Sequence, residues 1–332
     1  MNEIDHAAFP PEAAAPQDGA ASTGQHAGSW RQDRPDRRVI ALSDIQVCML
    51  VYNEEQFVRR SLGPLAKFID RFIIVDMGSE DKTLDIVREL LGERAQIIRY
   101  DREMLFTCGY AHARNYGTEF ATSPWILAID ADEVLTCGIS DDGVVVDRPL
   151  RDLSIVTVER RNIKKRIDEN LGSLNLLGSE LRSSERHRRL YRNEKSIHWV
   201  GYIHESLYHR ERPLTPRCEG ASGIILYHLA DFRDHVRDRW KRNQYSWMLL
   251  RAYRDRRLRD AISSYWFDNH VVPNLATIEA ESRAFLEAQN NERLGLLTHD
   301  EIGSDLTNNK EATEANDPGG PVTGNVAEKG KG

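Results

Sequence analysis

No long apolar run occurs anywhere in the 332 residues of this sequence. No stretch approaches the roughly 20 apolar residues that a membrane-spanning helix requires. The first residues also lack the basic and then apolar pattern of a secretory signal peptide. We therefore expect a soluble protein of the cytoplasm.

Cysteine is scarce, and no two cysteines are spaced as C-x-x-C. The four are Cys48, Cys108, Cys137 and Cys218. Such scattered positions indicate neither a zinc knuckle nor a disulfide framework. We expect reduced thiols that mostly fill the core.

Both ends of the sequence lack apolar periodicity. Residues 1–40 are rich in Ala, Pro, Gly and Gln, and residues 299–332 are polar with a Pro-Gly-Gly-Pro breaker cluster. These compositions predict a disordered leader and a disordered tail. Between them we expect one α/β domain over residues 41–231 and a helical region over residues 232–298.

Charge is unevenly distributed along the chain. The formal net charge is −7, yet residues 151–260 hold 25 Lys and Arg against 15 Asp and Glu. A locally basic half suits an anionic partner such as a nucleotide diphosphate, a phosphorylated lipid surface or nucleic acid. Charged, solvated helices are the alternative explanation.

Predicted strands and helices alternate in the first half of the folded segment. Apolar runs predict strands over residues 45–51, 72–75, 95–99 and 125–129, and helical periodicity predicts helices over 54–66, 79–91 and 109–121. Asn53 is expected to cap the first helix. This alternation indicates right-handed βαβ units and a mainly parallel sheet with helices on both faces.

The second half is less regular. Further strands are predicted over residues 154–158, 187–191 and 224–229, as antiparallel additions to the sheet. Residues 161–184 are polar and poorly periodic, which predicts a long loop with a lid as one interpretation. Helical periodicity resumes after Phe232, and another helix is expected near Asn274.

Acidic residues stand where the fourth strand ends. Asp130, Asp132 and Glu133 follow the apolar run 125–129 directly. In an open α/β sheet, ligands gather at the carboxyl ends of strands, so these acids are well placed to hold a cation and, through it, a phosphate. A solvated junction between strand and loop is the alternative.

Three further polar clusters, at residues 52–55, 76–83 and 111–115, are expected to line the same crevice. Gly78 permits a tight turn with exposed backbone amides. Asp76 can accept from a base N–H or a ribose hydroxyl, and Arg114 can counter a diphosphate or pair with Asp76. Each also has a structural alternative: Asn53 or Asp81 as a helix cap, Gly78 as a simple turn, and Arg114 in a surface ion pair.

Taken in order, four segments resemble the inverting nucleotide-sugar glycosyltransferases of family 2. They are Val51-Tyr52-Asn53-Glu54-Glu55, the turn 75–83, Ala113-Arg114-Asn115, and Asp130-Ala131-Asp132-Glu133 as an Asp-x-Asp signature. The resemblance implies the GT-A fold: a Rossmann-like, mixed but mainly parallel sheet with helices on both faces, here followed by a C-terminal helical region.

The resemblance also implies roles for particular residues. Asp132 would bind Mn²⁺ or Mg²⁺, which bridges the donor diphosphate. Seven residues would contact the nucleotide or the donor sugar: Val51, Tyr52, Glu54, Asp76, Gly78, Arg114 and Asp130.

Segments 189–193 and 199–205 resemble Arg-Leu-Phe-Arg-Asn and Gly-x-x-His-Glu segments of a bacterial branch of that family. This likeness implies that Glu205 is the general base, because the acceptor hydroxyl must lose its proton as it attacks the anomeric carbon. It also implies that His228 ligates the metal. A Glu205 paired with arginine and a His228 satisfied in the core are the structural alternatives.

The function that these residues imply is metal-dependent, inverting transfer of a sugar from a nucleotide-sugar donor, with a UDP-sugar favoured, to an acceptor hydroxyl in glycan or glycoconjugate synthesis. The acceptor stays open between a glycan, a lipid-linked molecule and a macromolecule such as a peptide or nucleic acid. A non-catalytic nucleotide- or glycan-binding module is the competing hypothesis.

The basic, aromatic stretch 233–259 allows two interpretations. It carries Trp240, Tyr245, Trp247 and Tyr253 among many arginines. It could dock nucleic acid or an anionic membrane, which for a cytoplasmic protein is the inner face. We favour the other interpretation, in which the aromatic side chains form a helix–helix or homodimer core while the arginines face water.

Overall fold

A computed structural model describes residues 38–166, 170–172, 174–210, 212–213, 216–255, 258 and 269–293. The predicted tail lies outside the described residues, as does the predicted leader apart from residues 38–40. Of these three, Val39–Ile40 form the short strand β1, which pairs with β7 (Val144–Val145). Residues 39 and 40 of the predicted leader therefore take part in strand pairing.

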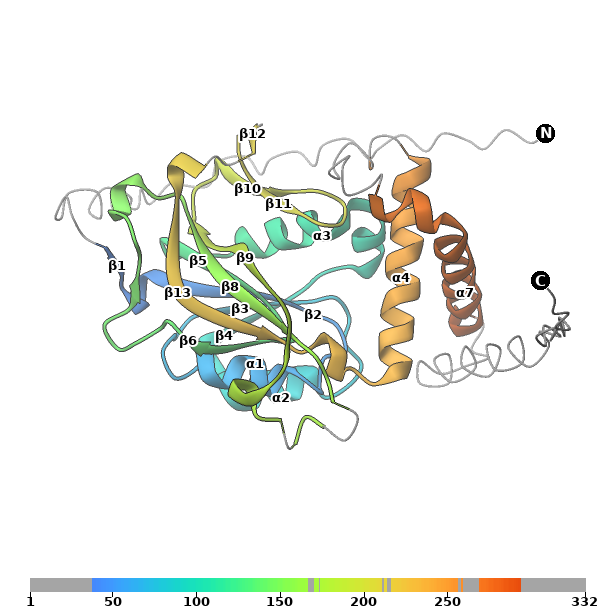
Figure 1. Cartoon of the computed structure of the whole chain (residues 1–332), viewed down its shortest axis with the longest axis horizontal. Coiled ribbons are helices and arrows are strands. Elements are labelled where there is room, and N and C mark those ends of the chain that lie inside the picture. The colour runs from blue at the N-terminus through green and yellow to red at the C-terminus, as the bar shows by residue number, and fades with distance from the viewer. Residues whose placement is uncertain are drawn as a thin grey trace, which may run out of the picture. The chain divides into compact units, whose positions relative to one another are not determined.

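An eight-stranded sheet lies at the centre of the structure (Figure 1). Its strand order is β4-β3-β2-β5-β9-β8-β13-β6. The strands are β2 (Ile45–Val51), β3 (Phe72–Asp76), β4 (Ala95–Arg99), β5 (Trp125–Asp130), β6 (Glu133–Cys137), β8 (Ile155–Ile163), β9 (Leu181–Arg192) and β13 (Glu219–His228). The pairs β2–β3, β3–β4, β2–β5 and β8–β13 are parallel, whereas β5–β9, β8–β9 and β6–β13 are antiparallel. The predicted mixed, mainly parallel sheet is confirmed.

Helices cover both faces of this sheet. Strand β2 shows this, since its residues are buried on both sides. Val47 and Met49 pack in one core cluster with residues of α1 (Val58–Leu65) and α2 (Thr83–Leu91). Cys48 and Leu50 point to the other cluster, which includes residues of α3 (Arg102–Thr118). Successive residues of a strand face opposite sides, so a fully apolar strand requires a layer on each side. Figure 1 shows α1 and α2 on one side of the strands and α3 on the other.

The predicted loop over residues 161–184 is too long at both ends. Strand β8 continues to Ile163 and β9 begins at Leu181, so that Arg161 pairs with Ser184. This ribbon carries charged and polar side chains along much of its length, so it lacks the apolar alternation from which a strand is predicted. A connection remains between residues 164 and 180.

The first predicted helix begins later than expected. Asn53 has a left-handed backbone (φ 51°) and caps no helix, and α1 begins only at Val58. Instead, the Asn53 side chain accepts from the backbone N–H of Glu80 at 2.8 Å, while its own N–H donates to Ser79 Oγ at 3.1 Å. The loops that follow β2 and β3 therefore hold each other.

Helix α3 is longer than predicted and breaks at Gly109. The backbone there has φ 83°, and a Cβ atom would lie 2.3 Å from the carbonyl oxygen of Tyr202. Only glycine combines this conformation with such a close approach. The predicted helix 109–121 matches the part of α3 after this break.

The remaining strands are β10 (Ile197–Val200), β11 (Ser206–His209) and β12 (Arg212–Pro213), which form a small antiparallel sheet. The predicted C-terminal helices are confirmed as α4 (His235–Arg254) and α7 (Leu275–Arg293), which lie side by side (Figure 1). No described helix is both long and apolar enough to cross a membrane. The predicted domain boundary between residues 231 and 232 stays a prediction.

Two aromatic side chains of α4, Trp240 and Trp247, form a helix–helix core with α7. The ring centroids of Trp240 and Trp247 lie 5.9 and 5.6 Å from that of Phe285 on α7. The expectation that the arginines face water is wrong for Arg233, just before α4, whose side chain is only 8% exposed and pairs with Asp132.

Candidate active site

A cavity of about 960 Å³ opens where β2 and β5 end, with α4 contributing to its wall. Most of the site residues predicted from the sequence line it: Tyr52, Glu54, Arg114, Asp130, Asp132, Glu205 and His228. Three do not, namely Val51, Asp76 and Gly78. The structure thus brings the carboxylates, the arginine and the histidine together and leaves part of the predicted nucleotide site outside the cavity.

Arg114 joins two carboxylates at the centre of the cavity. Its Nη2 donates to Asp130 Oδ1 at 2.7 Å, and its Nε donates to Glu205 Oε1 at 2.6 Å. The Arg114 side chain is 7% exposed. Burial alone would raise the pKa of Asp130, but Arg189 and Arg114 outweigh it and hold that pKa well below its ordinary value. Asp130 therefore stays ionised.

Hydrogen bonds from two residues of α3 position Glu205 beside Arg114. The side chain of Asn115 accepts from the backbone N–H of Trp199 and donates to its carbonyl, both at 2.8 Å. At the Gly109 break, the Tyr110 N–H donates to the Tyr202 carbonyl at 2.9 Å. Segment 199–202 is therefore fixed to α3 on both sides, and Glu205 follows directly. These hydrogen bonds explain why the sequence segments that contain Arg114 and Glu205 lie side by side in the structure.

Arg189 is a functional candidate. It stands in the segment 189–193 that resembles the family, but the sequence alone suggested no role for it. It lies in a β-bulge, since Val156 pairs with Leu190 while Thr157 pairs with Arg188. Bulges redirect a side chain and are frequent beside active sites. The Nη2 of Arg189 donates to Asp130 Oδ2 at 2.6 Å and to Glu133 Oε1 at 2.8 Å.

Glu133 completes this buried network. Its side chain has no exposed surface, and its Oε2 accepts from the backbone N–H of Asp130 at 2.9 Å. Burial raises the pKa of Glu133 despite the nearby Arg189. Glu133 therefore holds the backbone of the Asp-x-Asp segment in place and does not face a ligand.

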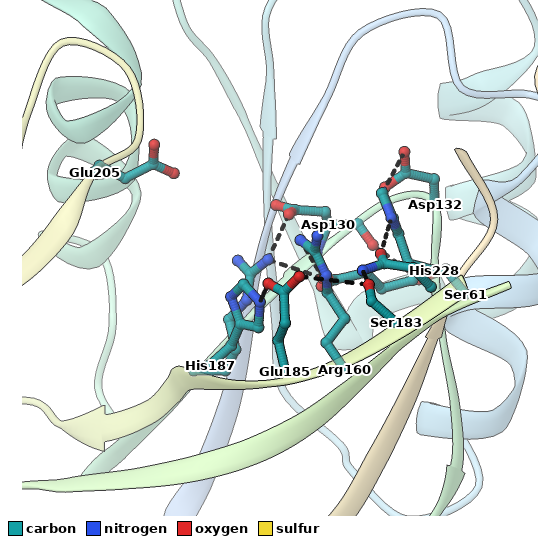
Figure 2. Close-up of polar contacts among 12 residues, drawn as sticks. Ser61, Asp130, Asp132, Arg160, Ser183, Glu185, His187, Glu205 and His228 are labelled. Carbon is teal, nitrogen blue, oxygen red and sulfur yellow. Dashed lines mark hydrogen bonds and ion pairs between the residues drawn. The ribbon is translucent and has the colours of Figure 1, made fainter. Parts of the chain in front are cut away.

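Asp132 and His228 lie next to each other (Figure 2), with His228 Nε2 3.5 Å from Asp132 Oδ2. The other ring nitrogen, Nδ1, lies 2.8 Å from Asn162 Oδ1. An amide oxygen only accepts hydrogen bonds, so Nδ1 donates to Asn162, and Nε2 is the ring nitrogen that faces Asp132. Histidine ligands of metals are oriented by this kind of outer hydrogen bond.

The residues present fit a divalent cation that takes most of its ligands from a substrate. Within the described part of the chain, no group of three His, Cys, Asp or Glu side chains could hold a metal ion alone. Mg²⁺ typically binds one or two protein carboxylates and fills its remaining positions with phosphate oxygens and water. Asp132 and His228, both lining the cavity, suit that arrangement.

Two cations, one just before α4 and one on α4, already contact Asp132. Arg233 Nη2 lies 2.5 Å and Lys241 Nζ 3.9 Å from its Oδ2. Burial would raise the pKa of Asp132, but contacts with Lys241, His228 and Arg233 outweigh it and keep that pKa well below its ordinary value. Sequence reasoning missed both cations. Arg233 precedes α4 and Lys241 lies on it, so no helical spacing in the sequence marks the two as a pair.

Asp76 and Gly78 serve the structure of the loop that follows β3. Asp76 is 1% exposed; its Oδ1 accepts from the Ser79 N–H at 2.8 Å and its Oδ2 from Arg99 Nη1 at 3.0 Å. The suggested pairing of Asp76 with Arg114 is therefore wrong. Gly78 adopts φ 98°, as its predicted role in a tight turn requires.

The chain matches the model of glycosyl transferase family 2 over residues 46–211 and belongs to that family. The predicted family and GT-A fold are confirmed. Over 95 residues it is 33% identical to a TPR repeat-containing protein of Synechococcus elongatus, covering 29% of this chain and 22% of that protein. Over 157 residues it is 27% identical to the prophage-derived glycosyltransferase SunS of Bacillus subtilis, covering 47% and 33%. It spans a third or less of the length of these relatives.

Solved structures are similar to this chain at low identity. One is a mannosyltransferase from Pyrobaculum calidifontis in complex with GDP-Man and Mn²⁺, 14% identical, covering 87% of each chain with a TM-score of 0.35. Another is S. aureus TarS 1–349 in complex with UDP-GlcNAc, 17% identical, covering 62% of this chain and 66% of that one with a TM-score of 0.34.

Proposed function

We propose that this protein transfers a sugar from a nucleotide-sugar donor to an acceptor hydroxyl, with inversion at the anomeric carbon. The observation that carries the proposal is the state of Glu205. Arg114 holds its Oε1, whereas its Oε2 has no hydrogen-bond partner among the described residues. Glu205 lines the cavity and is 14% exposed. A carboxylate oxygen that faces a cavity and has no partner there suits a general base.

The chemical step needs one base and one means of neutralising the leaving group. The acceptor oxygen attacks the anomeric carbon as its proton passes to Glu205, and the bond from that carbon to the diphosphate oxygen breaks. Asp130, held by Arg114 and Arg189, is placed to bind a donor sugar or ribose hydroxyl. Figure 2 shows Glu205 and Asp132 on either side of Asp130, which supports attack from the side opposite the diphosphate.

Asp132 and His228 would hold Mn²⁺ or Mg²⁺ in this proposal. When bound there, such a cation would neutralise charge on the departing diphosphate. The charges in the cavity support the need for a cation. Three carboxylates there, Asp130, Asp132 and Glu205, are already paired with arginines, namely Arg114, Arg189 and Arg233. These arginines are therefore engaged before a doubly charged diphosphate enters.

A UDP-sugar is the proposed donor, in line with the UDP-GlcNAc complex of TarS. The acceptor is proposed to be a glycan, a lipid-linked molecule or another macromolecule. A cytoplasmic location, a homodimer and contact of the basic helices with a membrane or nucleic acid stay predictions.

The experiment that tests the proposal incubates the whole chain with a panel of nucleotide sugars and Mn²⁺ and follows release of nucleotide diphosphate. Release should depend on metal and should fall steeply in Asp132→Asn. The matched control Asp141→Asn removes an exposed carboxylate and should leave release unchanged. Clear nucleotide binding without metal-dependent release from any donor would show that the chain is a binding module instead.

A further inference from the structure

Arg102 carries a buried hydrogen-bond donor that lacks a partner. It lies at the start of α3 and lines the cavity. Its Nη1 donates to the Tyr52 hydroxyl at 2.6 Å. Its Nη2 is buried and has no hydrogen-bond partner among the described residues. Buried donors in folded proteins are almost always paired, so an unpaired one on a cavity wall indicates a ligand atom.

The surroundings of Arg102 are aromatic and apolar. Its guanidinium carbon lies 4.2 Å from the ring centroid of Tyr52, 4.7 Å from that of Trp240 and 5.3 Å from that of Phe106. Leu50 and Leu105, from the core cluster against which Tyr52 packs, line the cavity as well. Rings on several sides fix the plane of the guanidinium. Its free N–H therefore has a defined direction.

This chemistry suits a flat, neutral ring that presents a carbonyl oxygen. An apolar, aromatic wall favours a planar ring over a diphosphate, whose charge is better placed beside the cations near Asp132. A guanidinium N–H needs an acceptor, and carbonyl oxygens of nucleobases are such acceptors. Uracil and guanine, like cytosine and thymine, carry carbonyl groups, whereas adenine carries none.

The residue predicted to read the base does not fill this role in the structure. Both carboxylate oxygens of Asp76 already accept hydrogen bonds, and Asp76 does not line the cavity. We propose that Arg102 is the residue that recognises the nucleotide base, an inference that rests on the proposed use of a nucleotide-sugar donor. Its Nη2 donates to a ring carbonyl of the base and so selects uracil or guanine over adenine. Tyr52 and Trp240 hold the guanidinium for this purpose.

Calorimetric titration of the whole chain with UDP and ADP, in Mn²⁺, tests the proposal. In Arg102→Met the affinity for UDP should fall roughly 10-fold, the order expected for one hydrogen bond, while the weak affinity for ADP should change little. The preference for UDP over ADP should therefore disappear. Arg102→Lys keeps the positive charge but lacks the planar pair of donors, and it should lose most of the preference too.

Asp76→Asn is the matched comparison. It should leave the preference for UDP unchanged, since Asp76 belongs to the loop and not to the cavity wall. If Asp76→Asn abolishes the preference while Arg102→Met retains it, the base is read by Asp76 and the proposal is overturned.

A merely structural role for Arg102 has a different signature. Loss of a clamp between α3 and α4 would lower the Tm and weaken UDP and ADP equally, which would also overturn base reading. If the wild-type chain binds no nucleotide diphosphate at all, the proposed function itself fails. If it binds UDP and the variants keep the preference, only the role of Arg102 fails.

Discussion

The guanidinium of Arg114 lies between Glu205 and Asp130, 2.6 Å from one carboxylate and 2.7 Å from the other. One buried cation therefore orients the proposed base and the proposed donor contact together. The position of either carboxylate depends on Arg114, and so does the balance of charge in the centre of the cavity.

Replacing Arg114 should damage stability as well as turnover. Arg114→Met leaves Asp130 and Glu205 without their shared partner, and breaking a buried ion pair typically costs about 3–5 kcal/mol. Urea denaturation measures the loss. The control Arg59→Met breaks an exposed pair with Glu89 whose partners are 49% and 63% exposed, and it should change stability little. Equal losses in the two variants would contradict the buried pairing.

Neutralising Glu205 should abolish turnover and spare binding. Glu205→Gln keeps the size of the side chain but cannot take a proton, so kcat should fall by about 10²- to 10⁴-fold. Affinity for the nucleotide diphosphate should change little. Single-turnover kinetics and calorimetry separate the two quantities.

Glu185→Gln is the matched control for that variant. Glu185 lies on β9 beside the same cavity and contacts His187 at 3.2 Å, with a side chain that is 52% exposed. Its neutralisation should leave kcat within about twofold of wild type, because surface changes away from buried features have small effects. A similar loss in both variants would indicate a general effect of negative charge and not a base.

Sequence patterning was sufficient for the parallel half of the fold. Strand 125–129 was predicted within one residue of β5, because a run buried on both faces is apolar at every position and its acids mark its end. The polar ribbon of β8 and β9 was not predictable in the same way. Arg161 and Ser184 pair without presenting an apolar face, so the sequence there lacks the apolar alternation that predicts a strand.

The candidate site was predictable only where it forms short motifs. Asp130, Asp132 and Arg114 stand in recognisable segments. Arg233 contacts Asp132 across 101 positions and Lys241 contacts Glu54 across 187, and no local pattern encodes such a contact. Nor does a local pattern show that the carboxylate oxygens of Asp76 accept hydrogen bonds from its own loop and from Arg99.

Removing the outer partner of His228 should weaken metal binding specifically. In Asn162→Ala the imidazole loses the contact that fixes its proton on Nδ1, and loss of such a partner typically lowers metal affinity 10- to 100-fold. Titrating Mn²⁺ into the chain saturated with UDP measures the affinity. His228→Ala should have at least as large an effect. The control His209→Ala alters an exposed histidine on β11 and should have none; a shift as large as that of Asn162→Ala would contradict the assignment.

His187 should make stability depend on pH between about 6.5 and 4. Burial, with help from Arg160 and Arg189, lowers its pKa from 6.5 to about 4. Between these values the unfolded chain binds a proton that the folded chain does not, so the free energy of unfolding should fall as pH falls, and His187 should add nothing further below pH 4.

Comparison with His187→Gln isolates this contribution of His187. Burial raises the pKa values of Glu54 and Glu133, and a raised carboxyl pKa acts in the opposite direction, since the folded state then takes up the proton first. The difference between the two proteins cancels those terms. Urea denaturation at pH 7, 6, 5 and 4 should show wild type losing stability relative to His187→Gln at each step. Parallel curves would mean that His187 is protonated as readily in the folded chain as in the unfolded one.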